Sequence, residues 1–422
     1  MNYIKDLNIE TELLPLFDYS LNGFTKNTIL KLLKTALTSE EAIIKRQNIL
    51  KGFGPNHSIL KEYSYTVLYL NETYIFTNDG SVKDLSLEKF NYKWLTSKPF
   101  KLNHVGKFNQ LILFFNRLES KYFSRLNLEV FPKAYSKNIK RILNYLSLFN
   151  TSQHEKIIRE RRLKDQHIIA LSKILYELRI SKKTQQFWED LFLFEAYLSI
   201  SLAHLKNDFV CPIFNKEKIE LKKFYNPLLI NPVKNDFSTS SNVILLNGPN
   251  MSGKSTFLKS VSICMYLAHL GLSIPAQSGN LKFVNYFSVN INKNDQLLNG
   301  YSHFMSEIMV LKNVLLKVRN NNSCFAIFDE LFSSTNVEDA FKVCKSTIQG
   351  LSQFSNSFFF ISTHIQQLKT ISHKNCSHYF IDCQLVDGIP KFNYTIKPGW
   401  SNVKVGQILF EKEGLNDLLK DT

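Results

Sequence analysis

The nine residues 248–256 constrain the fold of this chain more than any other stretch of its sequence. They form a G-x-x-x-x-G-K-S-T pattern, made of Gly248, Pro249, Asn250, Met251, Ser252, Gly253, Lys254, Ser255 and Thr256. The apolar run 243–246 stands directly before the pattern, and residues 257–261 after it have the composition of a helix start. A strand, a glycine-rich loop and a helix in this order are the setting of a phosphate-binding loop. The alternative is a chance glycine turn that opens a helix.

The pattern predicts a site for a triphosphate and a magnesium ion. The backbone N–H groups of such a loop face inward, and the helix N-terminus adds partial positive charge. We expect Lys254 to reach the β- and γ-phosphates and the hydroxyl of Ser255 to ligate Mg²⁺. ATP and Mg²⁺ are therefore the expected ligands.

Two acidic residues and a histidine follow later apolar runs. Asp329 and Glu330 end the run 324–328, and His364 comes shortly after the run 357–361. Open α/β sheets bind ligands where their strands end, so these side chains are expected beside the loop. We expect Asp329 to hold Mg²⁺ through water or Ser255, Glu330 to polarise the attacking water, and His364 to sense the γ-phosphate. An exposed acidic turn and an ordinary surface histidine are the alternatives.

Composition indicates a globular chain of two or three domains. Of the 422 residues, 44% are hydrophobic and 21% are charged, which is typical of folded proteins. Apolar runs are too short to span a bilayer, and the first residues lack the apolar core of a signal peptide. We therefore expect a cytoplasmic, nucleoid-associated protein without a membrane partner. The six cysteines form no C-x-x-C pair, which favours reduced, mostly buried thiols.

The net charge of +16 suggests a polyanionic partner such as DNA. A general bias towards lysine would give the same charge, so charge alone leaves the partner open. The charged segment 155–164 is consistent with a DNA-facing helix, although a solvated helix with i,i+4 ion pairs is the favoured reading.

The chain is expected to hold two domains. Residues 1–208 read mostly as helices, because apolar positions recur at helical spacing. The stretch 63–76 is ambiguous between a strand pair and a helix of poor intrinsic preference. In 209–422, strands alternate with helical stretches, as in an α/β sheet. The strand candidates are 243–246, 283–291, 324–328 and 357–361.

Several motifs together resemble the ATPase domain of the MutS family of mismatch-repair proteins. Residues 248–256 are similar to that family's G-P-N-M-G-G-K-S-T loop, with Ser252 in place of a glycine. The segment 295–307 resembles its D-x-L-x-x-G-x-S-T-F-M-x-E motif, and Asp329-Glu330 and Thr363-His364 match its D-E and T-H pairs. Weaker likenesses at 31–53 and 193–214 cover the family's helical core. The resemblance implies an ABC-type P-loop NTPase domain preceded by an all-α core-like domain.

The resemblance also implies an ATP-driven dimer that acts on DNA. ATP would lie between two subunits, and Ser302 would be offered to the γ-phosphate bound by the partner subunit. A homodimer of this kind would bind double-stranded or branched DNA in mismatch repair or related transactions, with other repair proteins as further partners.

The chain departs from the family pattern in several places. We expect it to lack a mismatch-recognition domain, because only about twenty residues precede the core-like part. We expect the DNA clamp to be shortened or missing, because the core-like part spans under 200 residues. Residues 332–335 stand where the family has G-R-G-T, and Pro232-Val233 stands where relatives often place an aromatic residue against adenine. The alternative function is an ATP-switched scaffold that binds a protein or branched DNA. An ABC-type ATPase of transport or chromosome maintenance is disfavoured, because no L-S-G-G-Q motif precedes Asp329.

Overall fold

The chain divides into two compact units. The computed structural model describes residues 4–78, 87–215, 218–291, 303–320, 322–333, 335–371, 373–386, 389–403 and 405–419. The sheet unit comprises Met1–Leu16, Leu32–Ile44 and His204–Thr422, and the helical unit comprises Phe17–Lys31 and Lys45–Ala203. This division assigns the two N-terminal segments Met1–Leu16 and Leu32–Ile44 to the sheet unit. The domain bounds 1–208 and 209–422 remain predictions from the sequence.

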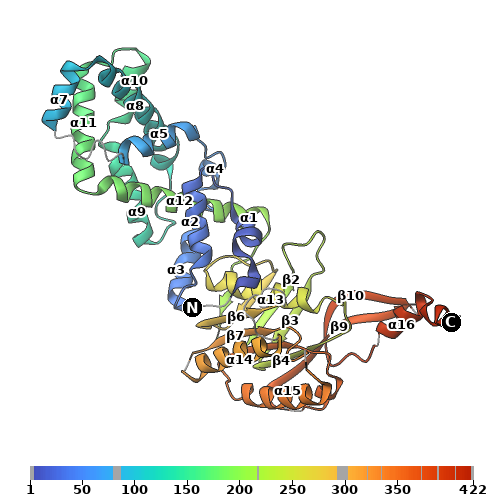
Figure 1. Cartoon of the computed structure of the whole chain (residues 1–422). Coiled ribbons are helices and arrows are strands. Elements are labelled where there is room, and N and C mark those ends of the chain that lie inside the picture. The colour runs from blue at the N-terminus through green and yellow to red at the C-terminus, as the bar shows by residue number, and fades with distance from the viewer. Residues whose placement is uncertain are drawn as a thin grey trace. The chain divides into compact units, whose positions relative to one another are not determined.

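The sheet unit contains a six-stranded sheet with the strand order β10-β9-β4-β8-β7-β6 (Figure 1). Neighbouring strands from β9 to β6 are parallel, and β10 is antiparallel to β9. The strands are β4 (Val243–Asn247), β6 (Tyr286–Asn290), β7 (Cys324–Phe328), β8 (Phe358–Ser362), β9 (Cys376–Val386) and β10 (Ile389–Pro398). All four strand candidates of the sequence are confirmed, and the chain is a mixed α/β protein.

Helices cover both faces of this sheet, so neither face meets water. The inner strands are therefore unbroken apolar runs. Every residue of β4, β7 and β8 is buried. On one face, Val243, Ala326 and Phe359 belong to a core shared with α14 (His303–Arg319) and α15 (Val337–Leu351). Side chains alternate between faces along a strand, so Phe325 and Phe360 lie on the other face, with ring centroids 5.4 Å apart.

The carboxyl ends of three strands meet at one edge of the sheet. Strand β8 pairs with β4 on one side and with β7 on the other. The phosphate-loop segment follows β4 and leads into α13 (Lys254–His269), while Asp329 follows β7 and Thr363 follows β8. The topology therefore brings together three loops that are far apart in the sequence.

A second, four-stranded sheet has the order β1-β5-β2-β3. Its strands are β1 (Ile213–Phe214), β2 (Ile219–Phe224), β3 (Asn235–Thr239) and β5 (Ser278–Leu281). Phe224 and Phe237 lie with their ring centroids 5.7 and 5.6 Å from the ring of Phe257. These contacts fix the start of α13, directly after the loop, against this sheet.

The N-terminal segments of the sheet unit pack against α13 and its surroundings. The hydroxyl of Tyr266 donates to the carbonyl of Leu33 at 2.7 Å, and Lys259 forms an ion pair with Glu12 at 2.5 Å. These contacts explain why both segments belong to this unit. Its remaining elements are η1 (Lys5–Leu7), η2 (Ile9–Leu13), η6 (Gln366–Thr370), α16 (Val405–Lys412) and α17 (Leu415–Leu418).

Within the described residues of the helical unit, every regular element is a helix. These elements are α4 (His57–Leu60), α5 (Val67–Asn78), α7 (Leu87–Thr96), α8 (Lys98–Asn116), η3 (Arg117–Tyr122), η4 (Phe123–Arg125), α9 (Lys133–Ser147), α10 (Thr151–Arg159) and α11 (Asp165–Ile180). Among the described elements, the helices with residues in both units are α1 (Leu14–Phe17), α2 (Gly23–Lys34), α3 (Glu40–Lys51) and α12 (Lys183–Lys206).

The ambiguous stretch 63–76 is helical over most of its length, as α5. Leu70, Thr73 and Phe76 are buried at helical spacing, so tertiary packing outweighs the β preference of its side chains. All six cysteines are free thiols, and four of them are buried. Among the described residues, none of the helices is long and apolar enough to cross a membrane.

Candidate nucleotide site

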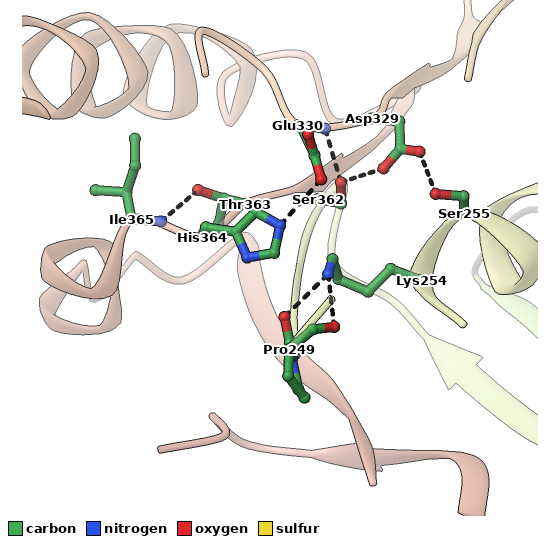
Figure 2. A network of polar contacts seen from close by, with 10 residues as sticks. Pro249, Lys254, Ser255, Asp329, Glu330, Ser362, Thr363, His364 and Ile365 are labelled. Atoms are coloured by element: carbon green, nitrogen blue, oxygen red, sulfur yellow. Dashed lines mark hydrogen bonds and ion pairs between the residues drawn. The ribbon is translucent and has the colours of Figure 1, made fainter. Parts of the chain in front are cut away.

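Lys254 is held inside the loop that joins β4 to α13. Its ammonium group donates to the carbonyl oxygens of Gly248 at 2.9 Å and Pro249 at 3.0 Å (Figure 2). The side chain is only 5% exposed. Burial lowers the pKa of Lys254, while the carboxylates of Glu330 and Asp329 oppose this shift. A poorly hydrated cation inside a ring of backbone groups is suited to bind phosphate oxygens.

Two glycines of the loop are required by its geometry. Gly248 and Gly253 have φ angles of 153° and 99°, in the region that favours glycine. A Cβ atom on Gly248 would lie 2.9 Å from the hydroxyl oxygen of Ser252, and one on Gly253 would lie 3.1 Å from the ring of Tyr394. Ser252 is fully buried and its hydroxyl has no hydrogen-bond partner among the described residues. Its side chain thus takes the space that the absent side chain of Gly248 leaves.

Asp329 joins the loop helix to the neighbouring strand. Its Oδ2 accepts a 2.5 Å hydrogen bond from the hydroxyl of Ser255, at the start of α13. Its Oδ1 accepts a hydrogen bond from the hydroxyl of Ser362, the last residue of β8. Both oxygens of the carboxylate are therefore oriented by side chains from two other elements.

Glu330 lies beside Asp329 and faces His364, as Figure 2 shows. Its Oε1 is 3.0 Å from Nε2 of His364, and its backbone N–H donates to Ser362 at 2.7 Å. Glu330 has a φ angle of 55°, which is uncommon for a residue other than glycine. The side chains of Glu330 and His364 are 32% and 39% exposed, so solvent reaches this pair.

The arrangement fits a magnesium–nucleotide complex. No group of three or more His, Cys, Asp or Glu side chains within the described residues could by itself hold a metal ion. Mg²⁺ rarely uses such cages; it takes one or two protein oxygens and completes its shell with phosphate oxygens and water. The adjacent oxygens of Ser255 and Asp329 are a donor set of this kind. The buried Lys254 ammonium, held by the carbonyl oxygens of the loop, suits the phosphates.

Most of the predicted site residues lie together. Ser255, Asp329, Glu330 and His364 belong to the hydrogen-bonded group described above, and Lys254 lies beside it (Figure 2). Within the loop, Pro249 is buried, whereas Asn250, Met251 and Thr256 are exposed. Ser302 lies outside the described residues.

Two further residues, Asn247 and Asn235, connect β4 and β3 to the C-terminal part of the chain near the loop. The buried Oδ1 of Asn247, the last residue of β4, accepts a 2.8 Å hydrogen bond from the backbone of Ser401. The amide of Asn235 bonds to the backbone of β10 at Tyr394 and Ile396, with distances of 3.0 and 2.8 Å. Their contacts depend on strands that meet only in the folded chain.

Comparison with known proteins identifies similarity over the same part of the chain. Residues 244–416 match the family model described as MutS domain V. This range begins in β4 and includes the loop, Asp329, Glu330 and His364. The match supports the resemblance that the sequence motifs indicated.

Curated relatives match at low identity. A protein named DNA mismatch repair protein MutS from Persephonella marina is 24% identical, over 77% of this chain and 39% of the relative. A protein of the same name from Borreliella afzelii is 25% identical, over 70% of this chain and 36% of the relative. The human MutS protein homolog 4 is 27% identical, over 42% of this chain and 19% of the relative. The chain thus spans less than two fifths of the length of these relatives.

Proposed function

We propose that this chain binds and hydrolyses ATP, with Mg²⁺, as part of a MutS-like protein that acts on DNA. The observation that carries the proposal is the hydrogen-bonded group at the sheet edge, in which Ser255, Asp329, Ser362 and Glu330 meet beside the buried Lys254. Phosphoryl transfer depends mainly on positioning and on compensation of negative charge. In this group, the hydrogen bonds position the side chains, and the Lys254 ammonium compensates negative charge.

Binding of the triphosphate would change the partners of Lys254. Its ammonium group now donates to two carbonyl oxygens of the loop, and the β- and γ-phosphate oxygens are stronger acceptors because they are charged. Burial removes competing water from this cation. The loop residues 248–256 would supply the remaining contacts through their backbone N–H groups.

Ser255 and Asp329 would hold the magnesium ion. When bound, Mg²⁺ supplies charge compensation to the β- and γ-phosphate oxygens. Asp329 is oriented for this role by the hydroxyl of Ser362. Ser255 would turn its hydroxyl oxygen from Asp329 towards the ion.

Glu330 would orient the attacking water and accept its proton. The water oxygen forms the new bond to the γ-phosphorus, and the bond to the bridging oxygen of ADP breaks. His364 is 3.0 Å from Glu330 in this structure. We propose that it releases the carboxylate when a γ-phosphate becomes available as its partner, which makes His364 a sensor of the bound state.

DNA, a partner subunit and a role in repair belong to the same proposal. The net charge of +16 favours a polyanion. The relatives carry the name mismatch repair protein, and the family resemblance assigns Ser302 to the ATP site of a partner subunit.

Steady-state ATP hydrolysis tests the proposal, measured without DNA and with homoduplex, mismatched and branched DNA in low salt. We expect hydrolysis that one of these DNA forms stimulates. Hydrolysis that no DNA changes, together with no DNA binding, would contradict the DNA part. Tight ATP binding without turnover would instead favour the ATP-switched scaffold.

A further inference from the structure

The turn after β7 carries a buried aromatic residue where the backbone favours glycine. Phe332 has a φ angle of 58°, an uncommon value for a bulky residue. Its side chain is fully buried. Such a conformation persists only where the surrounding structure holds it, and conformations of this kind gather at functional sites.

Two contacts attach Phe332 to α14. Its backbone N–H donates to Oε2 of Glu307 at 3.1 Å, and its ring centroid lies 5.6 Å from that of Phe304. Phe304 and Glu307 are three residues apart, so they lie on one face of the helix. A hydrogen bond to a charged acceptor and an aromatic contact thus hold the same residue from the same side.

The turn is also held from α15. The carbonyl of Leu331 is the acceptor for the thiol of Cys344 at 3.6 Å, and Leu331 is itself buried. The segment between Asp329 and Phe332 is therefore fixed at both ends: by Ser255 and Ser362 at its start and by two helices at its end. Glu330 lies between these anchors with its own positive φ angle of 55°.

We propose that Phe332 is a positioning residue for Glu330, acting through Phe304 and Glu307 of α14. Because Ser255 and Ser362 hold Asp329, the backbone of Glu330 can turn only if residues 331 and 332 move with it, and the packed ring of Phe332 opposes that movement. The inference rests on the proposed function, because it assigns a purpose to the orientation of Glu330. It goes beyond that function by naming the groups that set the orientation.

Two pairs of variants test the proposal in the full chain. Phe332→Leu keeps an apolar side chain but loses the ring contact, and Phe359→Leu is its matched control on β8, fully buried in the same core. Glu307→Ala removes the acceptor of the Phe332 N–H, whereas Glu307→Gln keeps an oxygen that can accept it. The measurements are kcat and KM for ATP, with thermal unfolding of each variant.

We expect kcat to fall at least about tenfold in Phe332→Leu and Glu307→Ala, with KM changed by less than about threefold. Glu307→Gln should recover most of the lost kcat. Phe359→Leu should lower the unfolding temperature and leave kcat near the wild-type value. If Phe332→Leu does not fold, the two Glu307 variants decide.

The inference is overturned if Phe332→Leu and Glu307→Ala keep wild-type kcat, or if Phe359→Leu loses as much kcat as Phe332→Leu. These outcomes leave the proposed function intact, because the wild-type protein still hydrolyses ATP. A wild-type protein that binds ATP and shows no hydrolysis would reject the proposed turnover itself, and the positioning role with it.

Discussion

The hydroxyl of Ser255 donates a 2.5 Å hydrogen bond to Oδ2 of Asp329, and this bond joins the first turn of α13 to the end of β7. The two residues are 74 positions apart in the sequence. Their oxygens lie side by side because only one strand, β8, lies between β4 and β7 in the sheet. The bond places two suitable magnesium ligands next to the loop.

Replacement of Asp329 should uncouple ATP binding from magnesium. We expect Mg²⁺ to tighten ATP binding by the wild-type protein and this gain to shrink roughly tenfold or more in Asp329→Asn, because a neutral amide is a poor magnesium ligand. ATP affinity is measured by titration calorimetry in Mg²⁺ and in EDTA. Ser260→Ala is the control, since Ser260 lies on the same helix and its hydroxyl donates to the backbone carbonyl of Thr256. An unchanged magnesium effect in Asp329→Asn would reject its role.

Replacement of Lys254 should abolish tight ATP binding. Charged hydrogen bonds to two phosphates are lost in Lys254→Ala, so affinity should drop by roughly 100-fold. Lys259→Ala is the matched control, because Lys259 lies on α13 and pairs with Glu12. Equal affinities of the two variants would show that Lys254 does not contact the nucleotide.

Gly248 and Ser252 should be coupled. In Gly248→Ala the new Cβ atom would lie 2.9 Å from the Ser252 hydroxyl, so the loop must distort and ATP affinity should fall at least about tenfold. In the double variant Gly248→Ala with Ser252→Gly, the collision is absent and part of the affinity should return. A double-mutant cycle in ATP binding measures this coupling. Strictly additive effects would contradict the packing described for Ser252.

His269 should make the sheet unit less stable in mild acid. Its Nδ1 lies 2.7 Å from the carbonyl of Met265 and its Nε2 accepts from the N–H of Val284 at 2.9 Å, so the neutral ring is fully used. Burial lowers the pKa of His269 from 6.5 to about 4. The unfolded chain therefore takes up a proton below pH 6.5 that the folded chain takes up only near pH 4.

His269 thus contributes about 3 kcal/mol to the free energy of unfolding. This contribution is complete above pH 6.5 and is lost as the pH falls towards 4. Other buried histidines titrate in wild type and variant alike, so the comparison with His269→Leu isolates this group. The gap in unfolding free energy between the two proteins should narrow from pH 7 to pH 4. A gap that stays constant over this range would show that His269 titrates normally.

The sequence predicted those parts of the fold that depend on patterns of neighbouring residues. Buried parallel strands such as β7 and β8 are unbroken apolar runs, and the phosphate loop has fixed spacing. The stretch 63–76 could not be decided, because its helical form depends on burial of Leu70 and Phe76 by distant residues. The contacts of Asn247 and Phe332 were equally out of reach, since their partners are distant in the sequence.

If Glu330 orients the attacking water, it is required for ATP hydrolysis and is not needed for ATP binding. Parallel measurement of ATP affinity and single-turnover hydrolysis in wild type and Glu330→Ala tests it most directly. We predict affinity within about threefold of wild type and a hydrolysis rate lower by roughly 100-fold or more, because the water loses its proton acceptor. Hydrolysis by Glu330→Ala at the wild-type rate would contradict the account.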